Sequence, residues 1–372
     1  MIIPLAIDLL ATLKSLFTFG VPFLLLLGVL VLVHEWGHFV VARLTKMPVE
    51  EFWIGFPPGK TWQRGDLKIG LGTIPLGGFV KITGMQLEEW DHPEGFNSKS
   101  LGARIAVLLA GCAMNLALGY VVLLLLYSAV NGSSNYVRAL ILDRPAARSG
   151  LKPGDQVVAI NGKPMSSSED IIKAITSSEG KRQTLVVRRA GQRRSIPIQP
   201  ERMPLPAGGN PDNPEQMRYG IGTIFGPNWV PTGFNLKVGF QRANATTATL
   251  LGMLVRLPIE LVRRPAATLQ MVGGPVSIVS QAGQSAQEGP YSFLFLMAQL
   301  SYSLAIFNLL PIPALDGGRI LLICYSDIQK ALIGRPFDPR KEVFLNAAGL
   351  AFLLLFILVI SAKDLGQIVG GG

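Results

Sequence analysis

The stretch Val29-Leu-Val-Leu-Val-His34-Glu35-Trp-Gly-His38-Phe-Val-Val41 places two imidazoles and one carboxylate inside an otherwise apolar run. Residues four apart on an α-helix project from one face about one turn apart, so His34 and His38 can reach a single metal ion. Glu35 lies about 100° round the helix axis from His34, close to such an ion without being a ligand. The stretch therefore predicts a helix with two metal ligands and a neighbouring carboxylate.

The apolar surroundings of these three groups strengthen the prediction of a metal. Ionisable side chains at membrane depth cost several kcal/mol each unless they are paired or coordinated. Together they predict a bound ion such as Zn²⁺, with Glu35 as the general base that activates water, which is the zincin arrangement. Two alternatives are a polar cluster that packs helices together and a stretch that lies outside the membrane.

Composition places the chain in a membrane, because 49% of its 372 residues are hydrophobic and only 16% are charged. A helix needs about 20 apolar residues to cross the hydrocarbon core, and four stretches are long enough, at roughly 20–43, 103–129, 292–323 and 343–361. We expect the first to be a retained helix, since it contains His34 and Glu35 and no cleavage site of the signal-peptide type follows it.

Charge and cysteine content exclude other classes. The net charge is +10, but the basic residues are dispersed over loops and do not alternate with aromatic residues, which argues against nucleic-acid binding. Cys112 and Cys324 fall within or at the end of predicted spans, so no disulfide framework is indicated.

Basic residues mark the cytoplasmic side of a membrane protein. They gather in two connections, between the first and second spans and between the third and fourth, whereas the N-terminal tail carries only Lys14 and the C-terminal tail only Lys363. We therefore expect both termini outside and these two connections in the cytoplasm. Their basic residues are Arg43, Lys46, Lys60, Arg64, Lys68, Lys81, Lys99, Arg104, Lys330, Arg335, Arg340 and Lys341.

A catalytic zinc site requires a third protein ligand and an open position. The remaining histidine, His92, lies in a polar loop and is predicted to be an ordinary solvated residue. Asp316 is the better candidate, because Pro311 and Pro313 break the third predicted span just before it, and irregular backbone at membrane depth is tolerated where it lines a cavity. The alternative is a prolyl kink with an interfacial aspartate.

The long segment between the second and third spans reads as a water-soluble domain of short strands and turns. Residues 139–164 predict a strand, a short helix that stops at Gly150, a second strand and an Asn-Gly turn; a helix over 166–176 and a hairpin around Ala190-Gly191 follow. The wording Ala-Ala-x-x-Gly-Leu-x-x-Gly-Asp-x-Val-x-x-Ile-Asn-Gly resembles a bacterial PDZ domain, which implies peptide binding by strand addition. Residues 219–224 are a candidate closing strand, and a domain that merely spaces the helices is the alternative.

The two metal-ligand motifs together resemble the site-2 protease family of intramembrane zinc metalloproteases. They are His34-Glu35-Trp-Gly-His38 and Asn308-x-x-Pro311-x-Pro313-x-Leu-Asp316-Gly. With one inserted PDZ domain, the chain is similar to the bacterial regulator of sigma-E protease branch. The resemblance implies that His34, His38 and Asp316 hold Zn²⁺ and that Glu35 activates water.

The same resemblance implies supporting residues for substrate. Gly111-x-x-x-Asn115 matches a motif of the second span, and Asn308 matches an active-site asparagine. Residues 67–82, which include Gly77 and Gly78, match a membrane-associated β element whose edge can hold an unwound substrate. Pro311 and Pro313 complete this supporting set.

The expected fold is a membrane α-helical protein with four transmembrane helices, a membrane-associated β element and an inserted α+β PDZ domain. A segment at 242–264 is predicted to be an interfacial amphipathic helix broken at Pro258, and either couples the PDZ domain to the membrane part or serves as a linker. The expected organisation is 1–49 first span; 50–100 β element and loop; 101–130 second span; 131–226 PDZ domain; 227–290 interfacial segment; 291–325 third span; 326–372 cytoplasmic loop and fourth span.

The expected function is zinc-dependent hydrolysis of peptide bonds within transmembrane helices of single-pass proteins, for which the family suggests anti-sigma factors or remnant signal peptides. Expected partners are these substrates, a PDZ ligand and the lipid bilayer. The expected location is the bacterial inner membrane, with the PDZ domain outside and the active site toward the cytoplasm. Alternatives are a non-catalytic PDZ-bearing scaffold and a membrane-anchored zincin that cuts soluble substrates.

Overall fold

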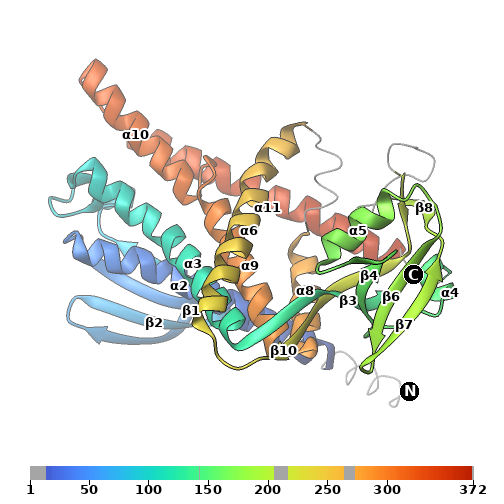
Figure 1. The fold of residues 1–372 in the computed structure, drawn as a ribbon. Helices are drawn as coiled ribbons and strands as arrows, with labels where there is room; N and C mark the ends of the chain where they lie inside the picture. Colours follow the sequence, from blue (N-terminus) through green and yellow to red (C-terminus); the bar gives the residue numbers. More distant parts are fainter. Residues whose placement is uncertain (1–13, 142, 205–216, 264–272, 371–372) are drawn as a thin grey trace, which may run out of the picture. The chain divides into compact units, whose positions relative to one another are not determined.

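The computed structural model describes residues 14–141, 143–204, 217–263 and 273–370 (Figure 1). The chain divides into two compact units. Unit 1 comprises residues 1–126, 241–260 and 272–372, and unit 2 comprises residues 127–240 and 261–271.

Among the described residues, four helices are long and apolar enough to cross a membrane. Their apolar residues surround the helix axis, which is typical of a helix that lipid or other helices cover on all sides. The four predicted spans are thereby confirmed. They are residues Leu16–Leu44, which join η1 (Leu16–Gly20) to α2 (Val21–Leu44), α3 (Leu101–Ala129), α9 (Pro290–Asn308) and the greater part of α11 (Pro339–Gly370).

The third span is shorter than predicted. A helix over 292–323 was expected, but α9 ends at Asn308 and a separate helix, α10 (Asp316–Ile333), begins after a turn. Pro311 and Pro313 cannot donate backbone hydrogen bonds and disfavour helix in the residue before each of them. The prediction that a cytoplasmic loop begins at 326 was also wrong, because α10 continues to Ile333 and ends at Gly334, whose φ is +77°.

The expected β element is a hairpin of two long bent strands, β1 (Val49–Arg64) and β2 (Leu67–Ile82). The first half of β1 pairs on both sides, so that Glu51 lies opposite both Lys68 and Lys81. Residues 78–82 thus form an outer segment of this small sheet, which lies beside α2 (Figure 1). Lys81 anchors that segment through ion pairs of 2.6 Å to Glu50 and 2.9 Å to Glu89.

The helices around the sheet are closely packed. A Cβ added to Gly37 of α2 would lie 2.4 Å from the carbonyl oxygen of Ala110 in α3, so only glycine allows this approach. A core of buried apolar side chains then joins α2, both strands, α3 and α10. Its members include Ala42, Phe52, Ile82, Val107 and Ile323.

Unit 2 contains a six-stranded sheet in the order β10-β3-β4-β6-β7, and the short β5 pairs with the end of β4 at Ala159 and Ile160. Alternation of buried and exposed residues in β6 explains the burial of one sheet face, against which α5 packs. The strands and helices are β3 (Val130–Leu140), α4 (Pro145–Arg148), β4 (Gln156–Ile160), β5 (Lys163–Pro164), α5 (Ser168–Thr176), β6 (Gln183–Arg189), β7 (Gln192–Ile198), β8 (Glu201–Pro204), β9 (Met217–Gly220) and β10 (Thr223–Pro231). β8 pairs with β9 in a separate ribbon.

Most local predictions for this unit agree with its structure, but the candidate closing strand over 219–224 is wrong, because β9 ends at Gly220 and β10 begins at Thr223, with Gly222 at a φ of +73° between them. Ala190 and Gly191 both have positive φ, as a two-residue turn between β6 and β7 requires. The unit has the strand and helix order that its PDZ resemblance predicts, and we refer to residues 130–231 as the PDZ-like domain. The predicted limits of 131–226 were too narrow, because β3 and β10 pair to their ends, with Val130 opposite Pro231.

The described residues of the segment predicted as interfacial, 227–290, include the helices α6 (Leu236–Arg263) and α8 (Pro275–Glu288). The predicted break at Pro258 is wrong, since α6 continues through this position; a proline removes one hydrogen bond, which neighbouring groups can replace. Within unit 1, α6 is held by hydrogen bonds from Tyr120 to Asn244 (2.8 Å) and between Thr247 and Tyr302 (2.7 Å).

Candidate metal centre

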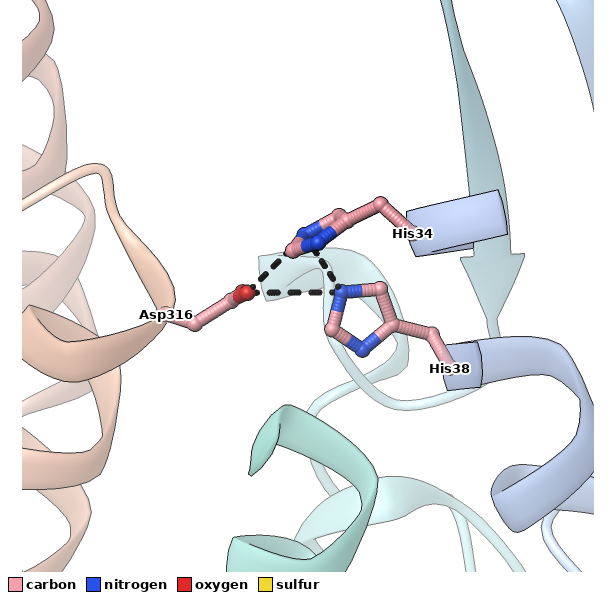
Figure 2. Close-up of side chains that lie close together, drawn as sticks. All are labelled: His34, His38 and Asp316. Carbon is pink, nitrogen blue, oxygen red and sulfur yellow. Dashed lines mark hydrogen bonds and ion pairs between the residues drawn. The ribbon is translucent and has the colours of Figure 1, made fainter. Parts of the chain in front are cut away.

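The two histidines of the opening motif lie in the second half of α2 and are buried, with exposed fractions of 7% for His34 and 8% for His38. Their Nε2 atoms are 3.1 Å apart. Figure 2 shows both rings turned toward the same point, as the spacing of one helical turn predicts.

Asp316 completes the cluster from the first residue of α10. Its Oδ2 lies 3.1 Å from Nε2 of His34 and 3.4 Å from Nε2 of His38 (Figure 2). Two atoms that each lie about 2.0–2.1 Å from Zn²⁺ at tetrahedral angles are about 3.3 Å apart. The triangle of two nitrogens and one oxygen therefore fits one face of a zinc tetrahedron, with a fourth position left for water or substrate.

The local sequence explains how Asp316 reaches the histidines. A Cβ on Gly317 would lie 2.2 Å from the carbonyl oxygen of Leu309, and one on Gly318 would lie 2.1 Å from that of Ile312. Only glycine therefore lets the first turn of α10 pack against the turn that follows α9. Two glycines after the aspartate are thus a structural requirement for its position.

The cluster lies at the wall of a cavity of about 360 Å³. Glu35 lines this cavity together with Val80 of β2. Asn308 lines it as well, with its Nδ2 atom 3.5 Å from Nε2 of His34. The cavity therefore presents a carboxylate and an amide beside the candidate metal position.

The remaining predicted residues divide into two groups. Asn115 lies next to the cluster, with its Nδ2 atom 3.4 Å from Nδ1 of His34. Pro311 and Pro313 are in the turn that precedes Asp316 and do not line the cavity.

Gly77 and Gly78 do not line the cavity either, although their neighbours Phe79 and Val80 do. Gly77 has a φ of +105°, and a Cβ on Gly78 would lie 2.4 Å from the carbonyl oxygen of Trp53. Their observed role is therefore to let β2 approach β1. His92 is exposed, as predicted, and lies outside the metal-ligand cluster that the described residues form.

Several residues at the site were not predicted from sequence. The carbonyl oxygen of Val107 is 2.8 Å from Nδ1 of His38, and the thiol of Cys112 donates to Oδ2 of Asp316 across 3.9 Å. Arg319, one turn after Asp316, lines the cavity. A backbone carbonyl leaves no sequence signal, whereas the position of Cys112 beside Gly111 could have indicated proximity to the metal site.

The comparisons with known proteins address the whole chain. The model of Peptidase family M50 matches residues 22–356. The chain belongs to Peptidase family M50. A relative from Clostridium acetobutylicum, described as a candidate zinc metalloprotease, is 30% identical over 92% of this chain and 95% of its own length. A second, from Clostridium perfringens and described in the same way, is 31% identical over 92% of this chain and 97% of its own.

Among solved structures, the PDZ domain of an SdrC-like protein from Listeria monocytogenes overlaps 27% of this chain and 88% of its own length, with 23% identity and a TM-score of 0.20. Family membership makes this M50 protein a membrane-spanning zinc metallopeptidase of the site-2 protease type. The residues that could hold its zinc are, by geometry, His34, His38 and Asp316.

Proposed function

We propose that this M50 peptidase hydrolyses peptide bonds within transmembrane helices of single-pass proteins, with His34, His38 and Asp316 as zinc ligands and Glu35 as general base. The observation that carries the proposal is the convergence of three ligand atoms, 3.1 to 3.4 Å apart, on a cavity whose walls include spanning helices. A substrate that reaches this cavity from the lipid is itself a membrane segment.

The chemistry follows from the side chains that line the cavity. When bound, Zn²⁺ supplies the Lewis acidity that polarises a carbonyl and activates water. Glu35 accepts the proton of the attacking water and delivers it to the leaving amine. Asn308 presents its amide to the same space and donates a hydrogen bond to the carbonyl oxygen as negative charge develops there.

The edge of β2 offers backbone hydrogen bonds to a substrate segment that has lost those of its helix. A helix satisfies its own carbonyls, so a segment must unwind before a peptide bond is accessible, and unwound backbone in lipid needs replacement hydrogen bonds. Residues 78–82 pair with β1 along one side, and Phe79, Val80 and Ile82 line the cavity. We assign this outer side of the segment to strand addition by the unwound substrate.

The PDZ-like domain offers a separate peptide site. A cavity of about 480 Å³ lies between α5 and residues 219–225, and apolar side chains such as Ile171, Ile175 and Phe225 line it. The cavity lies beside residues 223–225 of β10, and this position supports peptide binding by strand addition. The exposed end of a trimmed membrane protein is a ligand of suitable chemistry.

The distribution of basic residues supports the orientation. Loops rich in Lys and Arg stay in the cytoplasm, which puts the PDZ-like domain outside and the β1–β2 element on the cytoplasmic side of a bacterial inner membrane. Substrates of the family type, anti-sigma factors or remnant signal peptides, have a single span with a short outer segment after a first cleavage, which suits both sites.

The test compares the wild-type protein with Glu35→Gln, purified in detergent. We expect one zinc per chain in both proteins and cleavage of transmembrane substrates by the wild type, with a loss of about 10²- to 10⁴-fold in Glu35→Gln. Glu88→Gln is the matched control, because Glu88 is exposed and should leave cleavage unchanged. Equal rates for Glu35→Gln and wild type would refute the role of Glu35.

A further inference from the structure

We propose that α3, which supplies no metal ligand, fixes the tautomers of both histidines, and that Asn115 does so for His34 by accepting a hydrogen bond from its Nδ1. The inference rests on the proposed ligand set of His34, His38 and Asp316. It assigns Asn115 a positioning role, because its amide contacts a ligand ring on the side away from the candidate metal position.

His38 shows the simpler half of the arrangement. Its Nδ1 lies 2.8 Å from the carbonyl oxygen of Val107. A carbonyl oxygen can only accept, so Nδ1 of His38 carries the proton and donates. In a neutral imidazole the lone pair is then on Nε2, the atom that faces His34 and Asp316.

His34 requires the same tautomer for the same reason. Its Nε2 faces Asp316 at 3.1 Å, so as a ligand this atom must carry the lone pair and Nδ1 must carry the proton. The group opposite Nδ1, at 3.4 Å, is the amide of Asn115. Two donors would repel each other there, so the amide must present its oxygen to His34.

The burial of Asn115 limits the hydrogen-bond partners that its amide can reach. The residue is 0% exposed, and its Oδ1 has no hydrogen-bond partner in the orientation that points Nδ2 at His34. Rotation of the amide by 180° exchanges these two atoms, which places the oxygen opposite the Nδ1–H of His34. The rotated amide thus offers its oxygen to the Nδ1–H that His34 carries in the tautomer that zinc requires.

A single face of α3 makes all of these contacts. Val107, Gly111 and Asn115 follow at intervals of four residues, and Cys112 lies beside them. A Cβ on Gly111 would come within 2.5 Å of Nε2 of His38, so glycine is what lets this face approach the rings. Cys112 adds a weaker contact by donating its S–H to Oδ2 of Asp316 across 3.9 Å.

The experiment measures zinc affinity of the full-length protein by competition with a chelator, for wild type, Asn115→Leu and Asn115→Asp. Leu has a similar volume and no polar atom, so we expect a 10- to 100-fold weaker affinity. Asp keeps an acceptor opposite His34, so we expect an affinity within about threefold of wild type. Asn228→Leu, at an exposed position of β10, is the control for added hydrophobicity.

A role in helix packing alone predicts the reverse order. Leu would then be tolerated between apolar helices, and a buried Asp would be the disruptive change. Wild-type zinc affinity in Asn115→Leu therefore overturns the proposal. The backbone oxygen of Asn115, which accepts from Ser301 at 2.7 Å, is present in every variant and does not confound the comparison.

A second measurement uses the wild-type protein, so it does not depend on whether a variant folds. The chain has three histidines, so ¹⁵N-histidine NMR of the zinc-loaded wild type can resolve each ring. We expect a proton on Nδ1 of both His34 and His38, and a proton on Nε2 of His34 overturns the proposal. Full zinc affinity in His34→Ala would instead refute the ligand set, which separates that failure from one confined to Asn115.

Discussion

The two units each hold a carboxylate with little exposure to solvent, and they satisfy it in opposite ways. In unit 2, Asp155 is 1% exposed and accepts two hydrogen bonds of 2.6 Å from the guanidinium of Arg189 and one of 2.9 Å from the backbone of Lys152. In unit 1, Asp316 faces two imidazole nitrogens. No Lys or Arg of the described chain lies within 4.0 Å of its carboxylate.

The difference distinguishes a structural charge from the carboxylate that we propose as a metal ligand. Asp155 has its counter-charge within the fold, so the PDZ-like domain is complete without a ligand. Asp316 faces two imidazole nitrogens, and three atoms that each present a lone pair at short distance repel one another unless a cation lies between them. A largely shielded carboxylate that faces imidazoles and no basic side chain is therefore a useful sign of a metal site.

The largest expected effect follows removal of the charge in unit 1. Asp316→Asn should lose stoichiometric zinc and proteolysis together, because an amide is a poor ligand for this ion. Zinc content after purification is the measurement. Asp66→Asn, an exposed residue in the β1–β2 turn, makes the same chemical change and should keep one zinc per chain. Retention of zinc in Asp316→Asn would contradict the proposal that Asp316, unlike Asp155, holds a metal ion.

The same change in unit 2 should act on stability alone. Asp155→Asn leaves Arg189 partly unpaired and should destabilise the PDZ-like domain by about 3 kcal/mol, with no change in zinc content. Hydrogen exchange of the full chain should show faster exchange in β4 and β6. Loss of zinc in this variant would contradict the independence of the two carboxylates.

The contribution of Asp155 to the stability of the PDZ-like domain depends on pH with a definite sign. Burial opposes ionisation of Asp155, but the hydrogen bonds from Arg189 and Lys152 outweigh it and hold the pKa of this carboxyl below its ordinary value. A lowered pKa in the folded state gives stability above the unfolded pKa of about 3.9, and this stability is lost as the pH falls from there through the folded pKa. Asp155→Asn should abolish this part of the acid sensitivity.

The smallest expected effect concerns the start of α5, which forms one wall of the cavity that we propose as the peptide site. The hydroxyl of Ser167 accepts a hydrogen bond from the backbone of Asp170 at 3.1 Å. Ser167→Ala should cost about 1 kcal/mol of domain stability, measured by the same hydrogen exchange. Ser177→Ala, at the other end of the helix, removes a donor to the carbonyl of Lys173, which also accepts from the backbone of Ser177, and should cost only a few tenths of this. Equal effects would refute the capping role.

Local patterns determined much of this protein. Hydropathy determined the four spans, since a helix in lipid must be apolar over about 20 residues. The i, i+4 spacing brought His34 and His38 to one face, and Ala190-Gly191 specified a hairpin, because each depends on backbone geometry within a few residues. Asp316 could be named because an acid that follows two prolines in an apolar span is costly unless it is paired or coordinated.

Tertiary structure decided what depends on contacts between distant segments. It brought Asp316 within 3.1 Å of His34, placed the carbonyl of Val107 and the amide of Asn115 behind the ligand rings, and gave Gly77 and Gly78 a packing role. It also continued α6 through Pro258, which local propensity argued against. Propensity and spacing describe one segment at a time, whereas these features depend on which surfaces meet when the helices pack.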